Sequence, residues 1–129
     1  MIASITDRNI TSDLAIRTLR KALESQVTVK DGLILHSDQG SQYTSKAFTE
    51  FCESVNVTQS MSKAGYPYDN APMERYFNTL KNECTNLYEF TTEETLYQKV
   101  EEFAYVDYNH VRPHSYNGYR TPYEARTAA

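Results

Sequence analysis

Two acidic residues near the middle of the chain, Asp38 and Glu74, have the type and the context of ligands for a hard metal ion. Asp38 ends the apolar run 33–37 within HSDQGSQY, and Glu74 lies in DNAPMERYFNTLKNE, with the 35 residues 39–73 between them. Mg²⁺ prefers oxygen ligands and keeps several of its waters, so two carboxylates brought together from separate elements suit it. The two residues are therefore candidate metal ligands.

Each carboxylate also has an ordinary structural interpretation. An aspartate after a strand often caps the following turn with its side chain, and a glutamate on a helix usually lies on a solvated face. The neighbours of Glu74 favour a functional role, because polar residues recur around it at helical spacing and share a face that could meet a phosphate backbone. The residues of this face are Asn70, Glu74, Asn78 and Lys81.

The histidines suggest no second metal site. His36 shares a predicted strand face with Asp38 and could be a ligand or a proton carrier, but a strand histidine is more often packed and hydrogen-bonded. His110 and His114 lie four residues apart, a spacing that binds zinc on a helix. Pro113 between them makes a continuous helix unfavourable, so a zinc site is rejected.

The elements that must position these residues alternate between strands and helices. Apolar residues that recur every three or four positions predict helices, and short apolar runs between turn residues predict strands. The run 33–37 is continuous, as is typical of a strand covered on both faces. The order strand, helix, strand, helix, strand, helix, helix predicts an α/β domain. The expected strands are 1–6, 33–37 and 57–61, and the expected helices cover about 12–23, 44–54, 70–84 and 92–111, with Ser12 as the N-cap of the first.

The helix that carries Glu74 is expected to begin at Asn70, because Pro72 is tolerated only near a helix start. Before it, residues 62–69 contain glycine and proline without periodicity and predict a loop. One apolar stripe of the helix should face the core, and its residues are Met73, Tyr76, Phe77, Leu80 and Cys84.

Length and composition indicate one soluble globular domain over residues 1–129, with 115–129 as its C-terminal tail. The net charge of −4 argues against a protein that coats nucleic acid by bulk electrostatics, although lysines near the central stretch can form a local basic surface. No apolar run is long enough to span a membrane and no leader is recognised, so a cytoplasmic location is expected. Cys52 and Cys84 have no CxxC pattern and are interpreted as reduced packing residues.

Three ordered segments carry a resemblance that covers nearly the whole chain. They are HSDQGSQYTS, DNAPMERYFNTLKNE and YNHVRPHSYNGYRTPYEA. Together with the 35-residue acidic gap, they resemble the integrase-core domain of bacterial insertion-sequence transposases, relatives of retroviral integrases. The resemblance implies a ribonuclease H-like fold, with a mixed sheet flanked by helices. It also implies DNA transposition by in-line phosphoryl transfer, with an Asp, Asp, Glu triad that binds two Mg²⁺ or Mn²⁺ ions.

The resemblance assigns roles to individual residues. Asp38 matches the second aspartate of the triad and Glu74 its glutamate, while Lys81 matches a basic residue that contacts element-end DNA. Residues 62–69 match a mobile active-site loop, in which Lys63, Tyr66 and Tyr68 could touch DNA. Asn78 shares the DNA-facing stripe, and Asn70 is expected to support Glu74 by hydrogen bonding around the metal ligands. The implied partners are element ends and target DNA and further copies of the chain, with no membrane and no small-molecule substrate.

The sequence departs from the family pattern at its start. The first aspartate and the first two strands of the family lie upstream of the strand that residues 1–6 resemble, and neither Asp7 nor Asp13 fits the motif of that aspartate. The strands 1–6 and 33–37 are therefore expected to have unpaired edges, which favours strand exchange or aggregation. Two functions remain: a transposase catalytic core that is inactive as an isolated chain, or a truncated, non-catalytic remnant that at most binds DNA or a partner chain.

Overall fold

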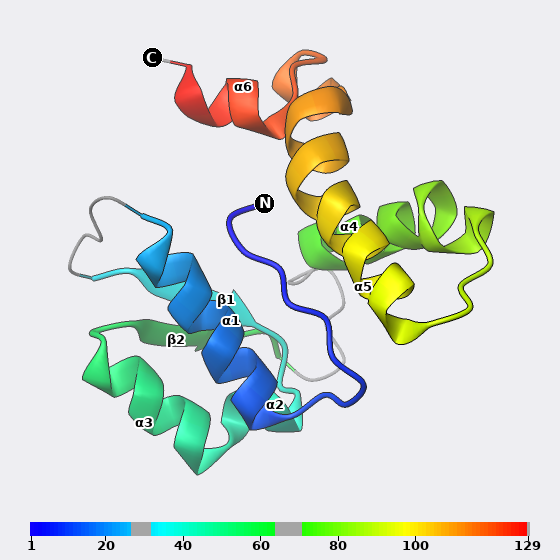
Figure 1. The fold of residues 1–129 in the computed structure, drawn as a ribbon. Helices are drawn as coiled ribbons and strands as arrows, with labels where there is room; N and C mark the ends of the chain where they lie inside the picture. Colours follow the sequence, from blue (N-terminus) through cyan, green and yellow to red (C-terminus); the bar gives the residue numbers. More distant parts are fainter. Residues whose placement is uncertain (27–31, 64–70, 129) are drawn as a thin grey trace. The chain divides into compact units, whose positions relative to one another are not determined.

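The computed structural model describes residues 1–26, 32–63 and 71–128 (Figure 1). The chain forms two compact units, which we treat one at a time. The first is Asp7–Tyr76, and the second combines Met1–Thr6 with Phe77–Ala129. We call them the 7–76 unit and the 77–129 unit.

The 7–76 unit is built around a pair of parallel strands joined by helices. Its elements are α1 (Ser12–Glu24), β1 (Ile34–Ser37), α2 (Ser41–Thr44), α3 (Lys46–Ser54), β2 (Thr58–Met61) and the start of α4 (Ala71–Glu83). In the register of β1 and β2, Ile34 pairs with Thr58 and Ser37 with Met61. A parallel pair needs a crossover connection, and α2 and α3 provide it. The carboxyl end of β1 therefore leads directly into the polar loop that contains Asp38.

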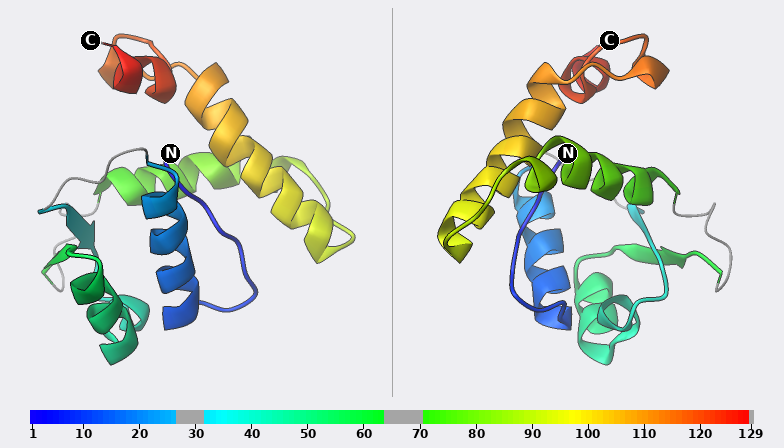
Figure 2. Two further views of the ribbon diagram at one scale, coloured as in Figure 1. Left: turned by 60° about the vertical axis from the view of Figure 1, so that its left-hand side comes forward. Right: turned by 90° about the vertical axis from the view of Figure 1, so that its right-hand side faces the viewer.

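The core of the 7–76 unit lies between α1, α3 and one side of the strands, and Figure 2 shows α1 and α3 side by side. Its buried residues are Leu19, Phe48, Cys52 and Val57. Burial raises the pKa of the Cys52 thiol, because the thiolate would lose its hydration. Cys52 and Cys84 are both free and buried, which confirms their interpretation as packing residues.

The expectation that β1 is covered on both faces is wrong. Leu35 packs against the core, whereas Leu33 is 42% exposed and Ile34, on the opposite face, is 64% exposed. Within the described ranges β1 pairs only with β2. The helices α1 and α3 cover the side that carries Leu35, so the other side of the apolar run faces solvent.

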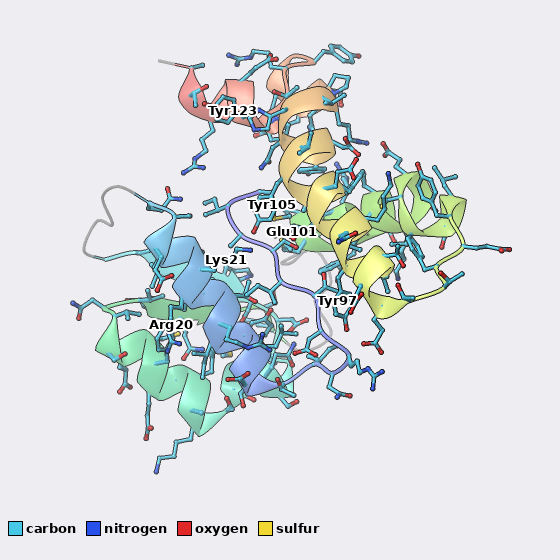
Figure 3. All side chains as sticks on the ribbon, viewed as in Figure 1. Arg20, Lys21, Tyr97, Glu101, Tyr105 and Tyr123 are labelled. Atoms are coloured by element: carbon cyan, nitrogen blue, oxygen red, sulfur yellow. The ribbon has the colours of Figure 1, made fainter. Side chains whose placement is uncertain are left out.

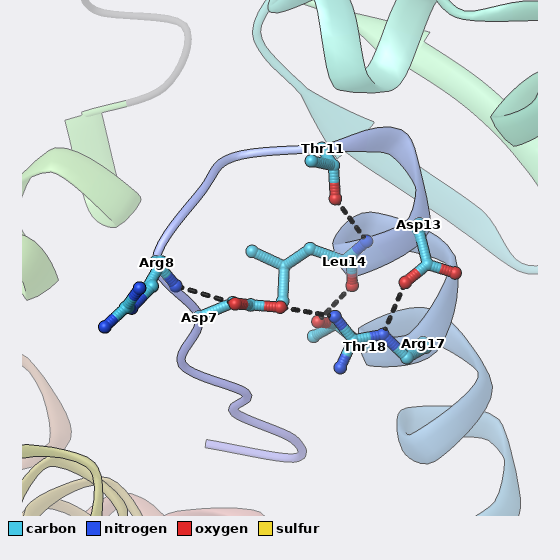
Figure 4. Close-up of polar contacts among 7 residues, drawn as sticks. All are labelled: Asp7, Arg8, Thr11, Asp13, Leu14, Arg17 and Thr18. Atoms are coloured by element: carbon cyan, nitrogen blue, oxygen red, sulfur yellow. Dashed lines mark hydrogen bonds and ion pairs between the residues drawn. The ribbon is translucent and has the colours of Figure 1, made fainter. Parts of the chain in front are cut away.

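The prediction of Ser12 as N-cap is also wrong, by one residue. Thr11 has extended backbone angles and its hydroxyl accepts a hydrogen bond from the Leu14 amide at 3.0 Å (Figure 4). Ser12 is already the first helical residue. Threonine and serine both cap helices well, so local composition did not distinguish the two neighbours.

The 77–129 unit is helical. It contains the end of α4, η2 (Thr85–Leu87), α5 (Glu93–Glu102), the π-helical η3 (Phe103–Val111), η4 (Ser115–Asn117) and α6 (Pro122–Thr127). The hydroxyl of Thr92 accepts from the Thr95 amide at 3.2 Å and caps α5, which continues directly into η3. This confirms the predicted helix over 92–111. Its buried side includes Val100, Phe103 and Ala104.

The predicted strand over residues 1–6 is wrong, because these residues form no regular element. A strand exists only by pairing with another strand, and no described strand pairs with this segment. Side chains of η3 instead form hydrogen bonds with the backbone groups of residues 1–6. Tyr105 Oη accepts from the Ser4 amide at 2.7 Å, and Asn109 Nδ2 donates to the Met1 carbonyl at 2.7 Å. Figure 3 labels Tyr105 beside this segment.

The apolar stripe of α4 is only partly buried. Tyr76 and Cys84 are buried, at 7% and 1% exposure, but Met73 and Phe77 are 45% and 51% exposed. The prediction that the whole stripe packs is therefore wrong for these two residues. Helical periodicity identifies which side chains share a face, but the width of the neighbouring elements decides how much of that face is covered.

Candidate active site

Asp38 lies where the sequence predicted it, immediately after β1, and it is exposed. Its Oδ1 accepts a hydrogen bond from the Gly40 amide at 2.8 Å. This is the turn-capping contact expected from the structural interpretation. It is compatible with metal binding, because a carboxylate has two oxygens and about four lone-pair positions. Burial, and secondly the negative charge of Asp38, raise the pKa of the half-buried Tyr43.

Gly40 has no side chain and so leaves room for the Asp38 carboxylate, a role that the sequence did not predict. A Cβ on Gly40 would lie 2.7 Å from Gln42 Oε1 and 2.9 Å from Asp38 Oδ1. Its φ of −56° is ordinary, so glycine is required for close approach and not for an unusual backbone conformation. The available signal was a glycine two residues after a capping aspartate, where the turn brings the side chain back over the backbone.

Replacing Gly40 by alanine is expected to displace the Asp38 carboxylate without unfolding the chain. The atoms that the new methyl group would crowd lie at the ends of flexible side chains, so they can move away from it. We expect Mn²⁺ affinity, measured by calorimetry, to fall about 10-fold, as for residues that orient metal ligands, while the thermal midpoint changes little. Ser41→Ala, at the exposed neighbouring position, is the control. Unchanged Mn²⁺ affinity in Gly40→Ala would contradict the positioning role.

His36 joins the two strands through both ring nitrogens. Nδ1 lies 3.0 Å from Ser60 Oγ and Nε2 lies 2.9 Å from Ser62 Oγ. Gln39 Nε2 donates to the Ser62 carbonyl at 3.1 Å and ties the loop after β1 to the end of β2. The hydrogen-bonded interpretation of His36 is confirmed, although the residue is exposed rather than packed.

Glu74 lies in the first turn of α4 and is exposed, as are Asn78 and Lys81. Their spacing of four and three residues places them on one face of the helix. Lys63, just after β2, is also described and exposed. The predicted site residues Tyr66, Tyr68 and Asn70 lie outside the described residues, as does most of the predicted loop 62–69.

Asp38 and Glu74 fit Mg²⁺ or Mn²⁺ by donor chemistry, since both are exposed carboxylates, the ligand class these ions prefer. Over residues 1–26, 32–63 and 71–128, no three His, Cys, Asp or Glu side chains gather closely enough to hold an ion. The structure places Asp38 just after β1 and Glu74 on α4, and their convergence on one ion stays a prediction.

Asp7 and Asp13, the two upstream acids, are both bound by one arginine (Figure 4). Arg17 Nη2 lies 2.7 Å from Asp7 Oδ2, and Arg17 Nε lies 2.8 Å from Asp13 Oδ2. The hydrogen bond from Arg17 lowers the pKa of the Asp7 carboxyl. Asp7 therefore ties the segment before α1 to that helix, whereas Asp13 pairs with Arg17 within the helix itself.

Comparison with known proteins identifies the family. Two models described as integrase core domain match this chain, over residues 1–67 and 55–122. The transposase for insertion sequence element IS904 of Lactococcus lactis subsp. lactis (strain IL1403) is 43% identical over 91 residues, which cover 70% of this chain and 36% of that protein. The IS600 uncharacterized 31 kDa protein of Shigella sonnei is 39% identical over 113 residues, covering 88% of this chain and 41% of the relative. The chain belongs to the integrase core domain family.

Solved structures support the fold. A chain of the simian T-cell lymphotropic virus intasome, solved in complex with PP2A regulatory subunit B56 gamma, matches with a TM-score of 0.65 and 17% identity over 95% of this chain and 42% of that one. The catalytic core domain of BIV integrase matches with a TM-score of 0.56 and 19% identity over 93% of this chain and 72% of that one. The predicted α/β, ribonuclease H-like fold class is confirmed.

The chain spans about two fifths of the length of the curated relatives described above. No helix in the described ranges is long and apolar enough to cross a membrane.

Proposed function

We propose that this chain is part of the catalytic core of an insertion-sequence transposase that rearranges DNA by metal-dependent phosphoryl transfer. The observation that carries the proposal is an exposed carboxylate, Asp38, at the carboxyl end of β1 in an integrase-core chain. The carboxyl ends of strands are where α/β sheets place their reactive groups. We infer that both units belong to one integrase-core domain, because the two family matches overlap at residues 55–67.

Asp38 and Glu74 are the proposed metal ligands, for Mg²⁺ or Mn²⁺. Bound between carboxylates, such ions activate an attacking water or 3′-hydroxyl and stabilise the leaving oxygen. The chain's own contribution is to hold Asp38 at the carboxyl end of β1 and Glu74 on α4. The Gly40 amide orients Asp38, and the regular backbone of α4 fixes the direction of Glu74. Asn70 is proposed to support Glu74.

The DNA-contacting surface is proposed to continue along α4 from Glu74. Asn78 offers an amide for sugar or phosphate oxygens and Lys81 a charge for a phosphate, and both are exposed. Lys63 would contact DNA from the end of β2, together with Tyr66 and Tyr68. Element ends and target DNA are the proposed substrates. Assembly of several copies is also proposed, in line with an intasome among the structural relatives.

Replacing Lys81 by alanine is expected to weaken duplex DNA binding uniformly across sequences. A lysine that neutralises one phosphate releases about one counterion, so the slope of log affinity against log salt should fall by about 1. Fluorescence anisotropy of labelled duplexes over a salt series measures both quantities. Lys46→Ala is the matched control, because Lys46 is a fully solvated lysine of α3, 89% exposed, and pairs only loosely with Glu50 at 3.7 Å. Equal effects of the two substitutions would contradict a specific role for Lys81.

A further inference from the structure

The segment from His114 to Arg120, here called the C-terminal loop, is closed on itself. A β-bridge joins its two ends, with the His114 amide donating to the Arg120 carbonyl at 3.1 Å. The Tyr119 amide donates to the His114 carbonyl at 2.9 Å, and Arg120 Nε donates to the Asn117 carbonyl at 3.1 Å. These bonds fix the loop around the short helix η4, so its side chains are presented by a defined backbone.

This loop presents two tyrosine rings to solvent. Tyr116 is 91% exposed and Tyr119 is 75% exposed, whereas Tyr88 and Tyr123, the other exposed tyrosines among residues 1–26, 32–63 and 71–128, are 49% and 48% exposed. Tyrosine is ordinarily at least half covered, because its ring is a large apolar surface. Tyr119 also has a φ of +63°, a left-handed conformation that is strained for a bulky residue. Strain of this kind persists where the surrounding structure enforces it, which is common at binding sites.

The end of the chain that carries the loop is basic, whereas the chain as a whole is acidic. Residues 110–129 contain three arginines, at 112, 120 and 126, and one acid, Glu124, for a net charge of +2. The whole chain has a net charge of −4, so residues 1–109 carry −6. Arg112 is engaged by Glu83, with Nε–Oε distances of 2.9 and 3.0 Å. Arg120 is exposed within the loop itself, so the loop carries a cation as well as the two rings.

We propose that the C-terminal loop binds unpaired nucleotides, with bases stacked on Tyr116 and Tyr119 and a phosphate on Arg120. Flat aromatic faces beside a cation are the combination that holds single-stranded nucleic acid, since every base offers a π-face and every linkage a negative charge. The proposal rests on the proposed function, because it assigns this loop to DNA that is opened or frayed near the reacting ends.

The absence of tryptophan from the chain gives a direct test. Tyr116→Trp places the chain's single tryptophan on the loop, and its selectively excited emission is expected to be quenched on addition of a single-stranded oligothymidylate. Tyr88→Trp, elsewhere in the same unit under the Lys99 ammonium, is expected to show no quenching. In parallel, Tyr116→Ala should lower single-strand affinity on the order of 10-fold, whereas Tyr116→Phe, which keeps the ring, should retain it.

The outcomes separate this inference from the function on which it rests. Suppose that the parent chain binds labelled DNA, but DNA does not quench the Tyr116→Trp emission and Tyr116→Ala binds single strands as tightly as the parent. The loop proposal is then overturned and the DNA function stands. Equal quenching by heparin, a polyanion without bases, overturns stacking. Loss of self-association in Tyr116→Ala with unchanged DNA affinity assigns the loop to a protein contact and also overturns the proposal. If the parent chain binds no DNA, the proposed function itself fails.

Discussion

Asp38→Asn and Glu74→Gln are each expected to weaken Mn²⁺ binding by at least about 100-fold. Each substitution keeps the shape of the side chain and removes the charge that a hard cation requires. Removing a direct ligand should cost at least as much as removing a group that only orients one, for which losses reach about 100-fold. Isothermal titration calorimetry with Mn²⁺ on the folded chain measures the affinity.

The double variant tests whether the two carboxylates share an ion. If they do, the losses in Asp38→Asn and Glu74→Gln should not add, since one lost ligand already empties the site. Glu53→Gln is the matched control, because Glu53 is an exposed glutamate of α3 in the same unit. Mn²⁺ binding that survives both single substitutions would contradict the site. A folded parent chain that binds no Mn²⁺ would favour the non-catalytic DNA- or partner-binding interpretation.

Phe48→Ala is expected to have the largest effect on stability. Phe48 is 1% exposed, it packs edge-on against Tyr43 with ring centroids 5.5 Å apart, and it lies in a core of four buried residues. Truncating a buried phenylalanine costs about 3–5 kcal/mol, a large share of the roughly 5–15 kcal/mol that stabilises a typical protein. The thermal midpoint, followed by circular dichroism, should fall by at least about 12 °C.

Phe51→Ala provides the comparison for this prediction. Phe51 lies on the same helix, three residues on, but it is only partly buried and its ring lies 5.1 Å from the Arg20 guanidinium carbon. Phe51 removes less apolar surface from water than Phe48 does, so the loss of stability in Phe51→Ala should be clearly smaller. Equal losses for Phe48→Ala and Phe51→Ala would show that the 7–76 unit does not depend on the cluster described above.

Much of the local structure could be predicted from the sequence because local signals determine it. The caps Ser45, Thr92 and Thr121 all precede helices in the structure, and each hydroxyl accepts a backbone N–H three residues on. The position of Asp38 was predictable in the same way, because this residue follows an apolar run that ends in a polar turn. The family was recognisable for a similar reason, because its signature residues lie within short, continuous segments.

Other features depend on which elements pack against each other, and the sequence did not predict them. Residues 1–6 have strand-like composition, but their backbone groups are bound by Tyr105 and Asn109, about a hundred residues away. Ile34 and Phe77 are apolar at positions that suggest burial, yet both are more than half exposed.

By itself, then, the sequence determined the family, the helix caps Ser45, Thr92 and Thr121, and the placing of one acidic residue after a strand and another in a helix. These properties depend on contacts between residues close together in the chain. Only the tertiary structure decided that His36 bridges two strands and that the side chains of Tyr116 and Tyr119 are exposed to solvent. Burial and close approach are set by the atoms of other elements, and a one-dimensional pattern does not contain those distances.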